Sequence, residues 1–291
     1  MSLWPSIAAH VARQLAVPCT YSAHRALAGG DINRAFLLTC GELRLFVKLN
    51  AAEHAAMFAA EAAGLQALAG GKAFRVPRPI CDGVQGDQAY LVLEYLQLRN
   101  TGDQRAAGTA LAELHRISEP RFGWVCDNTI GTTPQRNDWY DDWAEFWREL
   151  RLGFQLDLAE QRGYARDLRA GRELQARVGE LLQGHAPVAS LLHGDLWRGN
   201  FAFDETGRPA IFDPAVYFGD READLAMSEL FGGFSADFYA AYRDQWPLHE
   251  GYAERKTLYN LYHVLNHLNL FGGGYLPQAR AMIGQLLAEL H

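Results

Sequence analysis

The chain has 291 residues, of which 49% are hydrophobic and 21% are charged, and its formal net charge is −7. These proportions are ordinary for a globular protein, and the length suits one large domain or two lobes. The acidic balance argues against a broad basic surface, so we expect neither nucleic acid nor a membrane as a partner. A local basic site for a phosphorylated ligand remains compatible with this negative net charge.

The first residues, MSLWPSIAAHVARQLA, predict an amphipathic helix that opens at Pro5 and lack the features of a signal peptide. No apolar run approaches the roughly 18 residues that a membrane-spanning helix needs. The cysteines are scattered and show no metal-site spacing, so we expect reduced thiols in a cytoplasmic protein. They are Cys19, Cys40, Cys81 and Cys126.

The first hundred residues indicate a small sheet with one main helix. Residues 19–49 have strand character, interrupted by GGDIN and by a Gly41-Glu42 turn. Residues 52–69 are rich in alanine, leucine and glutamate and predict a helix. Strand character returns in PRPICDG and AYLVLEYL.

The pattern becomes mostly helical after QLRNTGD, with short strands expected in ASLLHGD, NFAFD and PAIFD. An aromatic-rich helix is expected around DWYDDWAEFWRELRLGF, with one buried face. The residues of that face are Trp139, Trp143, Phe146 and Trp147. We therefore expect an α+β protein of two lobes, a β-rich lobe over residues 1–96 and a larger α-rich lobe over residues 97–291.

The stretch LLHGDLWRGN places His193, Asp195 and Asn200 directly after two apolar residues. A second apolar run, AIFDPA, ends in Asp213, thirteen residues after Asn200. Each of these residues alone is most simply a turn or cap residue. Together they suggest chemistry, because amide and carboxylate oxygens suit Mg²⁺ and Asp195 could orient a hydroxyl group and accept its proton.

The spacing H-x-D-x-x-x-x-N followed by a strand-terminal aspartate resembles the catalytic and metal-binding loops of the protein-kinase-like fold. The resemblance implies ATP and Mg²⁺, with Asp195 as the catalytic residue and with Asn200 and Asp213 as metal ligands. Gly194 stands where protein kinases usually have arginine, and Asp-Pro-Ala replaces Asp-Phe-Gly. Both differences resemble the small-molecule kinases of this superfamily.

A kinase-like β-rich lobe needs a lysine for the phosphates, and Lys48 in LRLFVKLN is the candidate. A surface lysine at a strand edge is the ordinary alternative. Glu53 and Glu61 could both pair with Lys48. We prefer Glu61, because it lies in the middle of an apolar helix where an unpaired charge is costly, whereas Glu53 suits the first turn of that helix.

Two further segments are expected near the nucleotide. The GGDIN loop precedes the lysine strand, and its backbone N–H groups could approach the phosphates, although Gly-Gly is also simply a hairpin turn. The segment after AYLVL falls where a kinase-like hinge would bind adenine through its backbone. The residues concerned are Gly29, Gly30, Asp31, Asn33, Glu94, Tyr95 and Leu96.

Four motifs together resemble the fructosamine kinase (ketosamine-3-kinase) family: HGDLWRGN, DNTIGTTPQ, DPAVYFGDREADLAMSELFGGF and LYHVLNHLNLFGGGY. The similarity runs from GGDIN to residue 275. It implies transfer of the ATP γ-phosphate to the 3-hydroxyl of ketosamines, the sugar adducts of glycated amines, and so a role in deglycation. An aminoglycoside- or choline-type phosphotransferase and a non-catalytic nucleotide-binding module remain the alternatives.

Some residues have two interpretations. Trp197 could stack on a sugar ring or pack in the core. His263 and His267 have helical spacing that could bind zinc, but hydrogen-bonded histidines are the simpler expectation, with His267 on the acceptor side. The charged group in FGDREAD is expected to be a solvated helix N-terminus, with a role in substrate binding as the alternative. The sequence leaves open whether the acceptor is free or protein-bound, and the oligomeric state.

Overall fold

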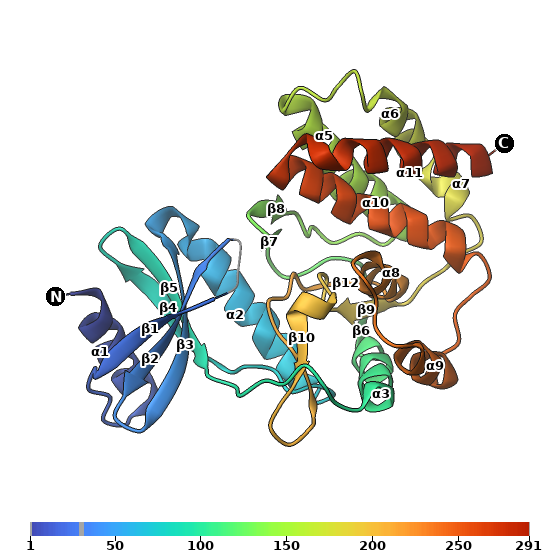
Figure 1. The fold of residues 1–291 in the computed structure, drawn as a ribbon. Coiled ribbons are helices and arrows are strands. Elements are labelled where there is room, and N and C mark those ends of the chain that lie inside the picture. Colours follow the sequence, from blue (N-terminus) through green and yellow to red (C-terminus); the bar gives the residue numbers. More distant parts are fainter. Residues whose placement is uncertain (1, 29–31, 291) are drawn as a thin grey trace. The chain divides into compact units, whose positions relative to one another are not determined.

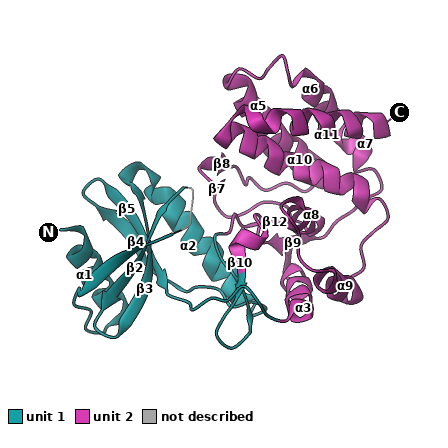
Figure 2. Ribbon diagram, viewed as in Figure 1, with its two compact units in different colours: residues 1–102, 202–213 teal, residues 103–201, 214–291 magenta. Residues whose placement is uncertain are grey.

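The computed structural model describes residues 2–28 and 32–290. The chain divides into two compact units (Figure 2). The first contains residues 1–102 and 202–213, and the second contains residues 103–201 and 214–291. The segment 202–213, which ends in Asp213, thus groups with the first unit. A lobe boundary at residue 96 stays a prediction.

The first unit contains an antiparallel five-stranded sheet in the order β1-β2-β3-β5-β4 (Figure 1). The elements of this unit are α1 (Leu3–Leu15), β1 (Ala23–Leu27), β2 (Arg34–Cys40), β3 (Leu43–Ala51), α2 (Ala55–Gly70), β4 (Pro79–Gln85) and β5 (Gln88–Glu94). The expected small sheet with one main helix is confirmed. The predicted N-terminal helix is also confirmed as α1, although it begins at Leu3 and not at Pro5, and a 3-10 turn (Ala52–His54) precedes α2.

Strand β3 shows how this sheet holds an apolar core on one face and a charge on the other. Leu45, Val47 and Leu49 belong to a buried cluster that includes Ile7 of α1. Because strand side chains alternate, Lys48 points to the opposite face, where α2 packs against β4 and β5.

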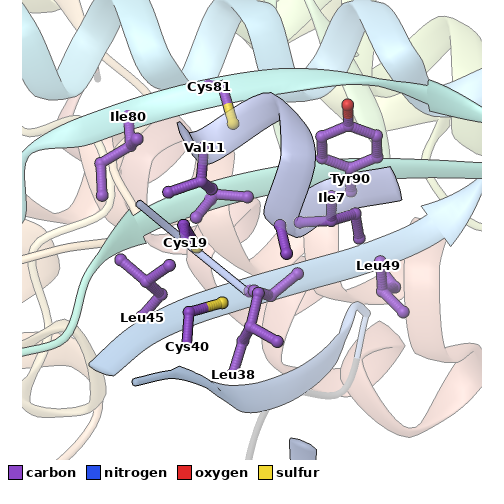
Figure 3. Packing of buried hydrophobic residues seen from close by; sticks show 13 residues of the cluster. Ile7, Val11, Cys19, Leu38, Cys40, Leu45, Leu49, Ile80, Cys81 and Tyr90 are labelled. Carbon is purple, nitrogen blue, oxygen red and sulfur yellow. The ribbon is translucent and has the colours of Figure 1, made fainter. Parts of the chain in front are cut away.

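The buried cluster between α1 and the sheet is shown in Figure 3. It includes the thiols of Cys19, Cys40 and Cys81. These three cysteines and Cys126 form no disulfide bond. Burial raises the pKa of the Cys40 and Cys81 thiols to about 12. These two thiols are therefore protonated at neutral pH and behave as apolar core groups.

The segment that ends in Asp213 belongs to the first unit because it pairs with that unit's backbone. It forms the hairpin β10 (Phe201–Phe203) and β11 (Pro209–Ile211). The N–H of Phe203 donates to the carbonyl of Arg99 at 2.8 Å, and the N–H of Ile211 donates to the carbonyl of Arg75 at 3.0 Å. These bonds fix the backbone two residues before Asp213.

The second unit is mainly helical. Its helices are α3 (Gln104–His115), α4 (Trp143–Phe146), a π-helical turn (Trp147–Gly153), α5 (Phe154–Gln161), α6 (Arg169–Ala176), α7 (Val178–Leu181), α8 (Glu222–Leu230), α9 (Ala236–Gln245), α10 (Tyr252–Phe271) and α11 (Leu276–Glu289). The expected aromatic face is confirmed for Trp143, Phe146 and Trp147, whereas Trp139 precedes the helix and is half-buried. Within the described part of the chain, no helix combines the length and apolarity needed to cross a bilayer.

Two small sheets complete the second unit. One has the order β12-β9-β6, and the other is the hairpin of β7 and β8. Their strands are β6 (Ser118–Glu119), β7 (Asn128–Ile130), β8 (Thr133–Gln135), β9 (Ala189–Leu192) and β12 (Tyr217–Asp220). All four residues of β9 are buried, and β9 pairs antiparallel with β12. The loop that carries His193, Asp195 and Asn200 therefore begins at a firmly held strand end.

Candidate functional site

Lys48 carries a buried positive charge between two carboxylates. Its Nζ lies 2.6 Å from Glu61 Oε1 and 2.7 Å from Asp213 Oδ1. Burial alone would lower the pKa of Lys48, but the attraction of Asp213 and Glu61 outweighs it and raises that pKa above its ordinary value. Lys48 is therefore a permanent cation at neutral pH. Glu53, the other candidate partner, lies beside His54 with an exposed side chain.

Asp213 follows β11 with an unusual backbone conformation and a partly exposed carboxylate. Its φ angle is 55°, in the left-handed region that aspartate tolerates better than most residues. Its side chain keeps 47% exposure although it accepts a hydrogen bond from Lys48. A partly exposed carboxylate held by a lysine suits a group that binds a ligand or a cation.

The loop from His193 to Asn200 is closed by its own polar groups. The Nδ2 of Asn200 donates to the carbonyl of Asp195 at 2.9 Å and to Asp195 Oδ2 at 3.0 Å. The N–H of Asp195 donates to Nδ1 of His193 at 3.2 Å, so His193 supports the loop from within. These two bonds from Nδ2 fix the orientation of the Asn200 amide against Asp195.

Asp224 anchors this loop, and the sequence did not single out that role. Its carboxylate accepts the N–H of His193 at 2.7 Å and the N–H of Gly194 at 2.8 Å, and it lies 3.2 Å from Nε2 of His115. Asp224 is 1% exposed. A buried carboxylate that accepts backbone N–H groups fixes the start of the loop, two residues before Asp195.

The charged group in FGDREAD begins a helix as expected, α8, but the expectation that this group is solvated is wrong, because it is buried. Its members are Asp220, Arg221, Glu222 and Asp224. Asp220 Oδ2 lies 2.6 Å from both Nε2 of His185 and the hydroxyl of Tyr259. Arg255 donates two hydrogen bonds to Glu222, at 2.6 and 3.0 Å. Arg221 donates hydrogen bonds to the backbone carbonyls of Trp246 and Pro247. Each buried group thus has a partner distant in sequence, which offsets the cost of its burial.

His185, Asp220 and Glu222 are close enough together to hold a metal ion. The bonds just described already engage their ligand atoms, since both carboxylate oxygens of Glu222 accept hydrogen bonds from Arg255 and Nε2 of His185 is bonded to Asp220. This cluster is therefore a structural network.

Gly194 cannot carry a side chain. Its φ is 80°, and an added Cβ would lie 1.9 Å from the carbonyl oxygen of Ala215. We expect Gly194→Ala to lower the free energy of unfolding by roughly 1–3 kcal/mol and to reduce kcat, because the loop must shift. Urea unfolding and steady-state kinetics measure both effects.

Gly207→Ala is the matched control, since Gly207 has a similar φ of 87° but open space around it. An equal loss of stability in the two variants would show that the contact with Ala215 has no energetic role.

The residues predicted to lie near the nucleotide are only partly among those that the structure describes. Gly29, Gly30 and Asp31 lie outside the described residues. Asn33 Oδ1 accepts a hydrogen bond from Nδ2 of Asn50 at 2.7 Å. The side chain of Glu94 is paired with Arg75, which leaves only the backbone of Glu94 for the predicted hinge role. Tyr95 and Leu96 follow β5, and the guanidinium carbon of Arg44 lies 4.8 Å from the centre of the Tyr95 ring.

Trp197 and His267 belong to one chain of ring contacts in the second unit. The rings of Trp197 and Phe231 have centroids 6.2 Å apart, and those of Phe231 and His267 are 4.9 Å apart. Trp197 is 37% exposed, so part of its side chain is accessible and it is not simply a core residue. The Nδ1–H of His267 donates to the carbonyl of His263 at 2.8 Å.

His263 is buried, and among the described residues its Nδ1 has no hydrogen-bond partner. Burial, then the neighbouring His267, lower the pKa of His263 to about 3. In the unfolded chain a histidine binds a proton below about pH 6.5. Lowering the pH from 7 to 5 therefore favours the unfolded state, and His263 should remove on the order of 2 kcal/mol from the free energy of unfolding.

Urea unfolding at pH 7 and pH 5 tests this expectation. His263→Leu should lose clearly less stability between the two pH values than the wild type does. His54→Leu, at a histidine whose side chain keeps 37% exposure, should behave like the wild type. An unchanged pH dependence in His263→Leu would contradict the burial argument.

The sheet with its buried lysine–glutamate pair and the loop with Asp195 and Asn200 define a kinase-like protein. The fold agrees with a crystal structure of the aminoglycoside phosphotransferase APH(4)-Ia, with a TM-score of 0.60, 16% identity and coverage of 97% of this chain and 98% of that one. At that identity the likeness concerns the fold alone. It confirms the expected bilobal kinase-like class.

The family follows from closer matches. The fructosamine kinase family model matches residues 3–289. A protein of Synechocystis sp. named as a probable ketoamine kinase is 48% identical, with coverage of 98% of this chain and 97% of that protein. The chloroplastic protein-ribulosamine 3-kinase of Oryza sativa subsp. japonica is 40% identical, with coverage of 91% and 78%. A Haemophilus somnus crystal structure assigned as a fructosamine-3-kinase has a TM-score of 0.88, 31% identity and 98% coverage of both chains.

The chain therefore belongs to the fructosamine kinase family, as its motifs indicated. As a member, it is an ATP-dependent kinase whose acceptor is a sugar hydroxyl.

Proposed function

We propose that the chain transfers the γ-phosphoryl group of ATP to the 3-hydroxyl of a ketosamine, free or attached to a protein. The observation that carries this proposal is the match to the fructosamine kinase model across residues 3–289. A relative named for ribulosamine 3-kinase activity supports the acceptor class. In the reaction the acceptor oxygen forms a bond to the γ-phosphorus, the bond from that phosphorus to ADP breaks, and the hydroxyl proton leaves.

Asp195 is the proposed catalytic residue, which orients the acceptor hydroxyl and takes its proton. The loop geometry supports this role, because Asn200 and His193 fix the backbone and one carboxylate oxygen of Asp195. Positioning of this kind accounts for most of the catalysis in phosphoryl transfer.

Asn200 and Asp213 are the proposed ligands of Mg²⁺. Their amide and carboxylate oxygens form a donor set that fits a hard cation. When bound, Mg²⁺ would neutralise charge on the phosphates. Lys48, held by Glu61, would do the same for the α- and β-phosphates, and the pairing supports this role because it keeps the lysine charged and fixed.

The nucleotide would also contact backbone groups of the GGDIN loop (Gly29, Gly30, Asp31 and Asn33) and of the segment from Glu94 to Leu96. The free thiols in the structure support a reducing compartment, and we propose the cytoplasm.

Trp197 and His267 are the proposed acceptor-side residues. Stacking of the partly exposed indole on a sugar ring predicts that Trp197→Ala raises the KM for the ketosamine by roughly 3- to 10-fold, since aromatic contacts contribute about 0.5–1.5 kcal/mol. The KM for ATP should be unchanged. Trp4→Ala, at a half-buried tryptophan of the first unit, is the control. Equal ketosamine KM values in wild type and Trp197→Ala would mean that the indole serves packing only.

A panel of acceptors tests the proposed function. ADP release is measured with ribulosamine and fructosamine adducts of a lysine derivative, with a glycated protein, with an aminoglycoside and with choline. The proposal expects ADP release that depends on the ketosamines. Phosphate transfer only to the aminoglycoside or to choline would show that ketosamines are not the substrates. ATP binding without transfer to any acceptor would indicate a non-catalytic nucleotide-binding module.

A further inference from the structure

The hairpin of β7 and β8, within the motif DNTIGTTPQ, has no part in the proposed chemistry, yet it carries two ordered amides. Asn128 begins β7 and Gln135 ends β8, and the antiparallel register sets them opposite each other. Gln135 is 1% exposed. A buried amide must have its donors and acceptors satisfied, so its partners show what it fixes.

Both amides donate to the backbone that follows Asp213. The Nε2 of Gln135 donates to the carbonyl of Ala215 at 3.0 Å, and the Nδ2 of Asn128 donates to the carbonyl of Val216 at 2.8 Å. Gln135 Nε2 also donates to Asn128 Oδ1 at 2.8 Å, which couples the two amides. The hairpin therefore binds two consecutive carbonyl groups as a unit.

The same short segment packs on the catalytic loop. The N–H of Ala215 donates to the carbonyl of His193 at 2.9 Å, and the Ala215 carbonyl oxygen occupies the space where a Gly194 side chain would lie. Ala215 thus lies between Gln135 on one side and the start of the loop that carries Asp195 on the other. A shift of this segment would move the backbone next to Asp195.

Further buried groups fix the orientation of the amides. Tyr262 donates its hydroxyl to Gln135 Oε1 at 2.7 Å, and Asn137 Nδ2 donates to Asn128 Oδ1 at 3.0 Å. Asn137 Oδ1 in turn accepts a hydrogen bond from Arg151 at 2.8 Å. With Oε1 and Nε2 of Gln135 both engaged, rotating its amide would break every bond it makes.

Arg151 is the last member of this hydrogen-bond network and is held by several contacts. It is fully buried, and the centroid of the Tyr217 ring lies 4.1 Å from its guanidinium carbon. It also donates to the carbonyl of Arg136 at 2.7 Å. Ring faces and the oxygens of residues 136, 137 and 150 stabilise its charge.

We propose that Gln135 and Asn128 are positioning residues, which hold Ala215 and Val216 against the catalytic loop and so keep Asp195 in place for phosphoryl transfer. This inference rests on the proposed function for its kinetic consequence. A displacement of about 1 Å at a reacting group can reduce a rate by 10²-fold. Loss of the Gln135 amide should therefore lower kcat much more than it changes substrate binding.

The test compares Gln135→Met with wild type. Methionine keeps the size and removes the donors and the acceptor. We expect kcat to fall by roughly 10- to 100-fold, with the KM values for ATP and ketosamine within threefold. Hydrogen exchange at the Ala215 amide, which donates to His193, should accelerate at least about tenfold because the segment opens more readily.

Two further variants make the result specific. Gln175→Leu is the control, because Gln175 also donates its Nε2 to a backbone carbonyl of this unit, that of Arg148, outside this network. It should leave kcat and Ala215 exchange unchanged. Tyr262→Phe removes only the hydroxyl that donates to Gln135 Oε1 and should lower kcat by a smaller factor. This variant provides the test if Gln135→Met folds poorly.

Wild-type kcat together with wild-type Ala215 exchange in Gln135→Met would overturn the inference, and so would an equal loss in Gln175→Leu. The exchange measurement needs no substrate. If the wild type transfers no phosphate to any ketosamine while Ala215 exchange still accelerates in Gln135→Met, the proposed function fails and the positioning of the loop stands.

Discussion

Replacing Asp195 by asparagine is expected to lower kcat by about 10²- to 10⁴-fold, the range that a positioned general base contributes. In the wild type, Asn200 Nδ2 donates a hydrogen bond to Asp195 Oδ2 at 3.0 Å. Asparagine has the same shape as aspartate and keeps an oxygen that can accept this bond. The loop should therefore stay folded, and only the proton acceptor is lost. Titration with a fluorescent ATP analogue should give a Kd within about twofold of wild type, since the residue is assigned to the acceptor.

The matched control is Asp142→Asn. Asp142 caps α4 by accepting the N–H of Glu145 at 2.7 Å, and asparagine caps helices equally well. Its turnover should equal that of wild type. Undiminished turnover in Asp195→Asn would remove Asp195 from the catalytic role, and an equal loss in both variants would point to a general effect of the substitution.

Replacing Lys48 by methionine is expected to lower kcat at least about 10²-fold and to destabilise the protein by about 3–5 kcal/mol. The lysine charge would be lost from the phosphates, and the buried Glu61 would be left without its partner. Glu61 and Asp213 would also repel each other without the cation between them. Steady-state kinetics and urea unfolding measure the two effects separately.

The double variant Lys48→Met with Glu61→Gln separates catalysis from stability. Glutamine at position 61 removes the unpaired buried charge, so the free energy of unfolding should largely recover while kcat stays low. Recovery of kcat in the double variant would mean that Lys48 serves the fold and not the phosphates. Wild-type kcat in the single variant would exclude Lys48 from the site.

The loop and the lysine were predictable from the sequence because their signals are local. His193, Asp195 and Asn200 lie within eight positions after an apolar run, and Lys48 is the lysine at the end of the predicted strand LRLFVKLN, between apolar neighbours. Glu61 was chosen over Glu53 because a mid-helix charge in apolar surroundings needs a partner, and the structure gives it Lys48.

The groups that hold the loop were not predictable, because their partners are distant in sequence. Asp224 binds the N–H groups of residues 193 and 194, and Gln135 binds a carbonyl 80 positions away. Asparagine and glutamine carry no periodic signal, so the motif DNTIGTTPQ pointed to the family but not to a hairpin that contacts Ala215. The charges of FGDREAD were assigned to solvent for the same reason: their partners Tyr259 and Arg255 come 39 and 33 residues later.

The site of phosphorylation is the most direct test of the central claim, that the chain is a ketosamine 3-kinase. The enzyme is incubated with ATP and a ribulosamine adduct, and the product is examined by phosphorus–proton correlation NMR before it decomposes. The account predicts one phosphorus signal correlated with the proton on carbon 3 and one ADP formed for each product molecule. A phosphorus correlated with another position, or no phosphorylated ketosamine while another acceptor is phosphorylated, would contradict it.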